Sequence, residues 1–196
     1  MHRQLSLFKT ADPKPNRYSV FLAIFPDDHT AQQIIELGNT LLQIHGLHGS
    51  VRPLNHLHVS LFSLGNFSDV PETLVETVGL ICKPFTAVTL PFEIKFNRAL
   101  SFRGKPGNNP LVLIDAQENN GVRHLYKLLI AEFSKYFRSP PSTPSFMPHL
   151  TLLYGKHELT PQPVDQVSWI VKEIVLVRSE VGATKYHQLG HWALGE

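Results

Sequence analysis

The stretch "HLHVSLFSLG", His56 to Gly65, decides how this chain is interpreted, because apolar and polar side chains alternate along it. Every second place is apolar, at Leu57, Val59 and Leu61. The imidazole of His58 and the hydroxyl of Ser60 fall between them. Since alternate residues of a strand point to opposite faces, the pattern predicts a half-buried strand that carries an imidazole and a hydroxyl side by side.

A second stretch of the same kind stands in the other half of the chain. It is "FMPHLTLLYG", Phe146 to Gly155, in which His149 and Thr151 take the places of His58 and Ser60. Both stretches continue with apolar residues and end on a glycine. We therefore expect His149 and Thr151 to share one face of a second strand.

The spacing around the two histidines indicates an internal duplication. His58 lies 40 residues after Tyr18 (58 − 18), and His149 lies 39 residues after Pro110 (149 − 110). A short β-rich run and a helical stripe fill each interval. The expected fold is α+β and two-lobed, with duplicated β-α-β units whose antiparallel sheets face each other across a central cleft. Residues 1–196 would form a single domain, with 1–17 as a loose extension.

The remaining elements follow from periodicity and from turn residues. Asp27 or Asp28 is a candidate N-cap for a helix whose apolar stripe begins at Ile34. Further strands are expected over 86–96 and 111–116, in "SWIVKEIVLVRS" and in "TKYHQLGHWAL". Loops are expected over 101–110 and at the break 139–145, and helices follow Pro71 and precede that break.

Composition limits the function classes. The chain has 196 residues, of which 42% are hydrophobic and 17% charged, as in globular proteins. A net charge of +2 is too small for a long nucleic-acid track. The apolar run Tyr18–Phe25 is too short to cross a membrane, and Cys82 has no second cysteine to pair with. We expect a cytoplasmic monomer that does not enter a membrane.

Two imidazoles across a cleft suit a reaction in which one group takes a proton while another gives one. The hydroxyls of Ser60 and Thr151 would hold a phosphoryl oxygen between them, which suits in-line displacement at phosphorus. Two other interpretations stay open. The histidines could be ordinary hydrogen-bonded strand residues. A metal site would need a further carboxylate or thiol that neither motif strand offers, so no metal and no other cofactor is expected.

The pair "HVS" and "HLT" resembles the two-histidine (2H) phosphoesterase superfamily, and within it the RNA 2′,3′-cyclic phosphodiesterases, also named 2′–5′ RNA ligases. The resemblance covers most of the chain from Tyr18 onward. "YSVFLAIFP" is similar to the family's first strand and "LNHLHVSLFSLG" to its first motif. "FMPHLTLLYG" is similar to its second motif and "KYHQLGHWAL" to its closing strand.

The resemblance implies a two-lobed α/β fold and metal-independent hydrolysis of a 2′,3′-cyclic phosphate to a 2′-phosphate, with 2′–5′ RNA ligation as a second activity. By position, His149 would be the general base and His58 the general acid. Ser60 and Thr151 would hold the phosphate. Many members carry an arginine shortly after the second motif, where this chain has Tyr154.

The expected partner is an RNA end or a cyclic nucleotide. Candidate contacts are the basic residues Arg52, Arg98 and Arg103, and the aromatic residues Phe62 and Tyr154. Alternative functions are a phosphodiesterase for a small cyclic phosphate or a 2′–5′ linkage, and a nucleotide-binding module without turnover. The presence of both histidines and both hydroxyls favours an enzyme.

Overall fold

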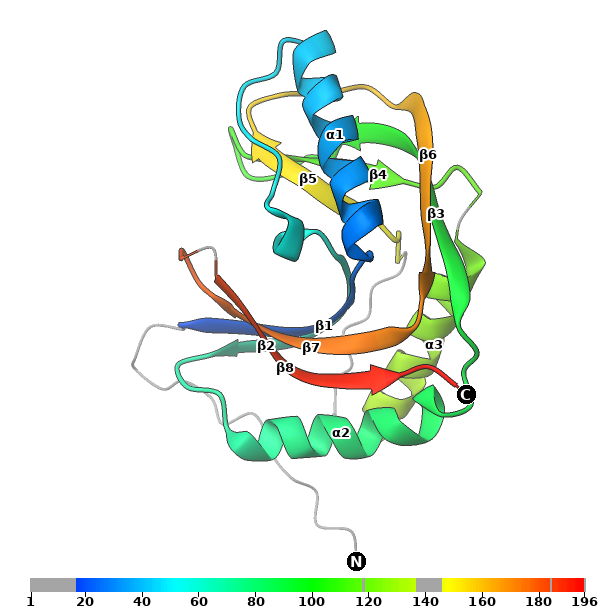
Figure 1. The fold of residues 1–196 in the computed structure, drawn as a ribbon. Helices are drawn as coiled ribbons and strands as arrows, with labels where there is room; N and C mark the ends of the chain where they lie inside the picture. Colours follow the sequence, from blue (N-terminus) through cyan, green and yellow to red (C-terminus); the bar gives the residue numbers. More distant parts are fainter. Residues whose placement is uncertain (1–16, 118, 137–145, 184, 196) are drawn as a thin grey trace, which may run out of the picture.

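The computed structural model describes residues 17–117, 119–136, 146–183 and 185–195. Within these residues, eight strands and three α-helices follow one another (Figure 1). They are β1 (Tyr18–Ile24), α1 (Asp28–Ile44), β2 (Val59–Phe67), α2 (Glu72–Thr86), β3 (Phe92–Ser101), β4 (Asn109–Ile114), α3 (Asn120–Ser134), β5 (Leu150–Gly155), β6 (Gln162–Val171), β7 (Glu173–Glu180) and β8 (Lys185–Ala193). A 3₁₀ helix, Leu54–His56, precedes β2.

The strands form an antiparallel sheet in the order β6-β3-β4-β5-β2-β1-β7-β8. This order is symmetrical about the β5–β2 contact, so β1, α1 and β2 hold the same places in one half as β4, α3 and β5 hold in the other. Figure 1 shows β2, β1, β7 and β8 in the lower half with α2 beneath them, and α1 lying over the upper half. The expected α+β fold with duplicated β-α-β units is confirmed.

The strands of the two halves pair with each other at very few of the described positions. β2 pairs with β1 along the whole of β1, but it pairs with β5 only through Val59 and Leu150. The chain also passes from one half to the other at Lys172, between β6 and β7, where the ribbon bends sharply in Figure 1. The relative position of the halves therefore depends on this single strand contact, on the bend, on the apolar core and on α1, which follows β1 of one half and packs against β5 and β6 of the other.

Helix α1 begins and packs as its sequence predicts. The Asp27 side chain accepts a hydrogen bond of 2.8 Å from the Thr30 N–H, which makes Asp27 the N-cap. Ile34 and Leu41 are buried as part of the expected stripe, and α1 packs against β5 and β6. Ile44, at the end of the helix, is 70% exposed, so the stripe stops one turn earlier than expected.

Two expected strands differ from those observed. Thr86 ends α2, and β3 begins only at Phe92, because the Thr89 hydroxyl donates back to the Phe85 carbonyl (2.7 Å) and the Ala87 N–H donates to Lys83 (3.2 Å). The alternation of β-branched residues over 86–90 resembles a strand, but the chain there finishes a helix.

The stretch "SWIVKEIVLVRS" holds parts of two strands rather than one. Lys172 separates β6 from β7, because β6 pairs with β3 in one half and β7 pairs with β1 in the other. The expected extension, apart from Arg17, and the break at 139–145 lie outside the described residues.

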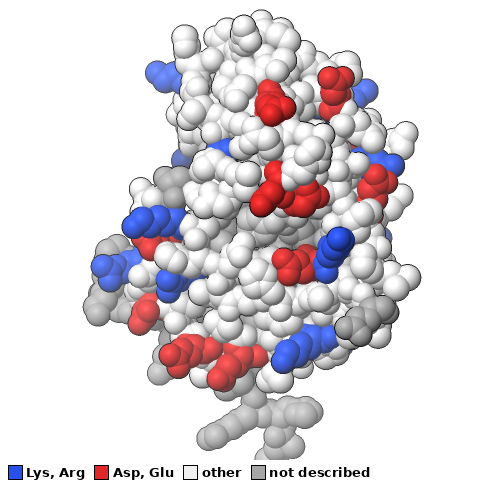
Figure 2. Space-filling model, viewed as in Figure 1, with Lys and Arg blue, Asp and Glu red and all other residues white. Residues whose placement is uncertain are grey.

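Two surface observations bear on function. None of the helices formed by the described residues is long and apolar enough to cross a membrane. Basic and acidic side chains are interspersed over the face shown in Figure 2, without a continuous basic track. This agrees with the small net charge of +2.

Candidate active site

The contact between the two halves brings the motif residues together. His58 and His149 are the residues directly before β2 and β5. Because Val59 pairs with Leu150 in an antiparallel register, the next positions set His58 opposite Thr151 and Ser60 opposite His149. Residues directly opposite each other share one face of a sheet, so all four side chains lie on the same face.

A β-bulge in each motif strand changes which later side chains reach this face. Leu22 pairs with Phe62 while Ala23 pairs with Ser60, so Leu61 is an extra residue in β2. The bulge turns Ser63 toward the site and turns Phe62 away from it. Phe62 is only 5% exposed and packs against Phe133 of α3 at 4.7 Å between ring centroids. Phe62 as a substrate contact is therefore wrong.

The same bulge occurs at the equivalent place in β5. Leu111 pairs with Leu153 while Val112 pairs with Thr151, so Leu152 is the extra residue. Strict alternation would place Leu153 beside Thr151 and Tyr154 on the other face. The bulge reverses this, since Leu153 is buried in the core and Tyr154 is 49% exposed.

These side chains line one cavity of about 350 Å³. Its walls come from β1, β2, β5, β7, β8 and the segment before the 3₁₀ helix. The lining residues are Ser19, Phe21, Arg52, His58, Ser60, Ser63, His149, Thr151, Tyr154, Ser179 and Tyr186. Six sequence-predicted site residues are thus brought together. Arg103 is an exposed residue of the β3–β4 loop and does not line this cavity.

Both imidazoles are held in the same way. The Nδ1–H of His58 donates to the His56 carbonyl (2.8 Å), and the Nδ1–H of His149 donates to the Met147 carbonyl (2.9 Å). A carbonyl can only accept, so each neutral ring carries its proton on Nδ1 and keeps a lone pair on Nε2. The Ser60 hydroxyl lies 3.1 Å from Nε2 of His58.

The ring of His58 is half-buried and has aromatic neighbours. Its ring centroid lies 5.2 Å from that of Phe21, 5.7 Å from Phe25 and 5.5 Å from Tyr186. Burial lowers the pKa of His58 from 6.5 to about 4, the His56 carbonyl opposes this, and the positive charge of Arg52 adds to it. His58 is therefore neutral at pH 7 in the free protein.

His56 contributes to the site by its backbone carbonyl and by stacking. It ends the 3₁₀ helix, is 3% exposed, and stacks on Tyr186 with ring centroids 4.2 Å apart. Its carbonyl fixes the ring of His58. Tyr186, from the far end of the chain, was not singled out from the sequence, and no local pattern marks it.

Arg52 lies beside Tyr154 and Tyr186. Its backbone N–H donates to the carbonyl of Leu152, the bulged residue of β5, at 2.7 Å. Its Nη2 donates to the Tyr186 hydroxyl at 2.9 Å. The guanidinium carbon is 5.6 Å from the centroid of the Tyr154 ring and 5.8 Å from that of Tyr186, within cation–π range.

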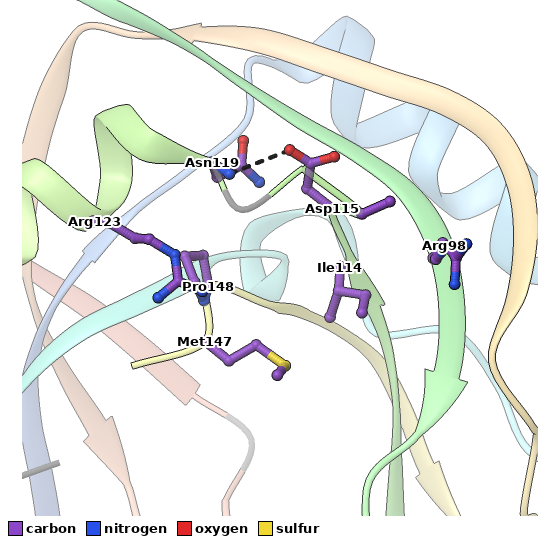
Figure 3. A pocket seen from close by; sticks show the side chains of 8 residues that line it. Arg98, Ile114, Asp115, Asn119, Arg123, Met147 and Pro148 are labelled. Atoms are coloured by element: carbon purple, nitrogen blue, oxygen red, sulfur yellow. Dashed lines mark hydrogen bonds between the residues drawn. The ribbon is translucent and has the colours of Figure 1, made fainter. Parts of the chain in front are cut away.

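A second cavity of about 330 Å³ lies next to the segment that precedes His149 (Figure 3). Figure 3 shows Arg98 and Arg123 on opposite sides of it, with Ile114 between them. Arg98 of β3 pairs with Ile114 of β4. Leu113 of β4 pairs with Leu150 of β5, so the next residue of β4, Ile114, lies opposite His149. Arg98 therefore lies two strands from His149 on the same face, about 10 Å away.

The described residues contain no group of three or more His, Cys, Asp or Glu side chains that could hold a metal ion. His149 has an aromatic neighbour instead, because the Phe102 ring meets it edge-on at 5.1 Å. What the first cavity offers is two imidazoles, several hydroxyls and one guanidinium, a set suited to binding an anion and moving protons.

Comparisons with known proteins agree with this geometry. A family model described as the 2′-5′ RNA ligase superfamily matches residues 25–183. The fold is similar to that of Escherichia coli LigT, both in its apo form and in complex with 3′-AMP. In both comparisons the sequence identity is 22%, the match covers 93% of this chain and 100% of LigT, and the TM-score is 0.71. A Thermus thermophilus protein matches with 22% identity, 91% and 99% coverage, and a TM-score of 0.69. A comparison with curated protein sequences gave no match.

Proposed function

Since this chain belongs to the 2′-5′ RNA ligase superfamily of two-histidine phosphoesterases, we propose that it hydrolyses RNA 2′,3′-cyclic phosphate ends to 2′-phosphates without a metal. The observation that carries the proposal is the single cavity lined by two carbonyl-anchored imidazoles and two motif hydroxyls. Structures of LigT with 3′-AMP and with phosphate support a nucleotide phosphate as the kind of ligand.

In the proposed reaction, Nε2 of His149 takes a proton from a water molecule as its oxygen attacks phosphorus. The bond from phosphorus to the 3′ oxygen breaks, and Nε2 of His58 gives its proton to that oxygen. The products are a 2′-phosphate and a free 3′ hydroxyl. The hydroxyls of Ser60 and Thr151 donate hydrogen bonds to the non-bridging oxygens, where charge accumulates.

His58 must acquire a proton before it can act as the acid. Its pKa of about 4 describes the free protein, in which burial and Arg52 oppose the charged ring. A bound phosphodiester places a negative charge beside the ring, which favours the imidazolium. Substrate binding and proton uptake by His58 are therefore coupled, and the rate should fall on both sides of a pH optimum.

The experiment is to incubate the protein, with excess EDTA, with each nucleoside 2′,3′-cyclic monophosphate, with an oligoribonucleotide that ends in a cyclic phosphate, and with a 2′–5′-linked dinucleotide. Chromatography and ³¹P NMR identify the products. We expect 2′-phosphates and no 3′-phosphates. Turnover of the 2′–5′ dinucleotide alone, or a requirement for added metal, would overturn the proposal.

Variants test whether the cavity is the active site. His58→Ala and His149→Ala should each lower kcat by several orders of magnitude, and the double variant should be scarcely worse, because the two act as a unit. His124→Ala, an exposed histidine of α3, is the matched control and should keep full activity. Retained activity in either cavity variant would contradict the proposal. The proposed function also includes a cytoplasmic location and a monomeric state. Size-exclusion chromatography tests the monomeric state.

A further inference from the structure

The charges in the first cavity are unbalanced. Arg52 is the one lysine or arginine among the described residues that line it, and none of these residues is an aspartate or glutamate. Arg52 takes part in none of the ion pairs formed within the described parts of the chain. A partly buried cation without a counter-ion is unfavourable, so binding of an anionic ligand in this cavity is favoured.

The position of Arg52 depends on the second motif strand. The bulge at Leu152 leaves a carbonyl that accepts the Arg52 N–H at 2.7 Å, which ties the backbone of Arg52 to the strand that carries His149 and Thr151. The Tyr186 hydroxyl and the rings of Tyr154 and Tyr186 then hold the guanidinium. Among the described residues, Nη2 is the one guanidinium nitrogen hydrogen-bonded to another side chain and Nε is buried without a partner, so N–H groups of the fork are left for a ligand.

We propose that Arg52 binds the phosphate of the substrate, supplying from the segment before the first motif the positive charge that Tyr154 cannot supply after the second. This assignment rests on the proposed function and extends it to a further substrate-binding residue. The guanidinium donates to a non-bridging oxygen and offsets the charge that grows there as water adds to phosphorus.

The same arrangement couples binding to proton uptake. In the free protein the charge of Arg52 disfavours a proton on His58. An anion bound to Arg52 neutralises that charge and lies beside the imidazole. Arg52 therefore favours anionic ligands, and a bound anion offsets one of the contributions that keep His58 neutral, the largest of which is burial.

The first test is kinetic. Arg52→Ala should lower kcat/KM for a nucleoside 2′,3′-cyclic phosphate at least 100-fold, and Arg52→Lys should recover part of it, because lysine keeps the charge but loses the planar fork. Tyr186→Phe removes the hydroxyl that holds the guanidinium and should raise KM about tenfold with a smaller effect on kcat. Lys127→Ala, at an exposed basic residue of α3, is the matched control and should change nothing.

Moving the positive charge from position 52 to position 154 tests whether the charge itself is what the substrate needs. The Tyr154 ring lies 5.6 Å from the guanidinium carbon, so an arginine side chain from position 154 reaches the same volume. Arg52→Ala combined with Tyr154→Arg should regain at least tenfold of the lost kcat/KM. Failure of both this double variant and Arg52→Lys to exceed Arg52→Ala, with all variants folded by circular dichroism, would overturn the assignment.

A binding measurement separates this inference from the proposed reaction. Calorimetric titration with a nucleoside 2′-monophosphate uses the His149→Ala background, so no turnover is involved. Arg52→Ala should weaken binding at least 30-fold and flatten its dependence on salt. If cyclic phosphates are not hydrolysed but this loss of binding is seen, the proposed function fails and the assignment of Arg52 stands. Equal affinity with and without Arg52 rejects the assignment whatever the activity.

Discussion

Replacing His58 with glutamine should make the protein's stability less sensitive to acid. In the unfolded chain the pKa of a histidine is about 6.5, whereas burial lowers that of His58 to about 4 in the folded protein. Between these pH values the unfolded state binds a proton that the folded state does not. The free energy of unfolding therefore falls as the pH falls from about 6.5 to about 4, and His58 contributes no such loss above pH 6.5.

The size of the effect follows from the two pKa values. The difference between 6.5 and about 4, at about 1.36 kcal/mol per pH unit, corresponds to about 3 kcal/mol. Urea unfolding of the unmodified protein and of His58→Gln at pH 7, 6, 5 and 4 measures it. The two should show the same change in stability down to about pH 6.5. Below that, the unmodified protein should lose up to about 3 kcal/mol more than the variant.

His124→Gln is the control, since it removes an exposed histidine and leaves His58 in place. It should lose as much stability as the unmodified protein. Equal losses in the unmodified protein and in His58→Gln between pH 7 and pH 4 would refute the reasoning, because the imidazole would then titrate alike in the folded and unfolded chains.

Sulfate extends this prediction to function, because it keeps its charge across the range from pH 4 to pH 8. If an anion in the cavity puts a proton on His58, sulfate affinity should rise up to tenfold for each pH unit lowered toward pH 4, and His58→Gln should abolish that rise. A rise that persists in His58→Gln would assign the proton to another group and would refute the coupling between anion binding and His58.

The remaining predictions concern the roles of single side chains. A substrate with a good leaving group should partly rescue His58→Ala but not His149→Ala, because only the acid becomes dispensable; equal rescue contradicts the assignment. Thr151→Ala should lower kcat/KM about 5- to 30-fold, the effect of about 1–2 kcal/mol from one lost hydrogen bond. Phe62→Ala should destabilise the fold by about 3–5 kcal/mol in urea unfolding, since its ring fills the core. Arg98→Ala should raise KM for an oligonucleotide with a cyclic end but not for a cyclic mononucleotide, because only a longer chain reaches its cavity.

Local patterns in the sequence determined the elements that carry the chemistry. Strand alternation identified β2 and β5 and set His58 beside Ser60 and His149 beside Thr151, because the period of two is a property of the strand itself. The N-cap at Asp27 and the stripe of α1 were readable for the same reason. The matched spacing of the two halves even indicated the symmetry of the strand order.

Tertiary structure decided which of these side chains meet and which others join them. The Val59–Leu150 pairing sets the two histidines on one face, and it joins residues about 90 positions apart in the chain. The bulges at Leu61 and Leu152 depend on pairing with β1 and β4. They send Phe62 into the core and Tyr154 into the cavity, against simple alternation, because an inserted residue reverses the direction of the side chains that follow it up to the next bulge.

The surroundings of the site also come from distant segments. Tyr186 reaches His56 and Arg52 from β8, and Arg52 is positioned by the carbonyl of Leu152 on β5. No pattern within a short window of sequence records such contacts, because they arise from the packing of one half of the sheet against the other. The residue types of the reaction were thus local information, while the electrostatic environment of His58 and the place of the Arg52 guanidinium were decided by the assembled fold.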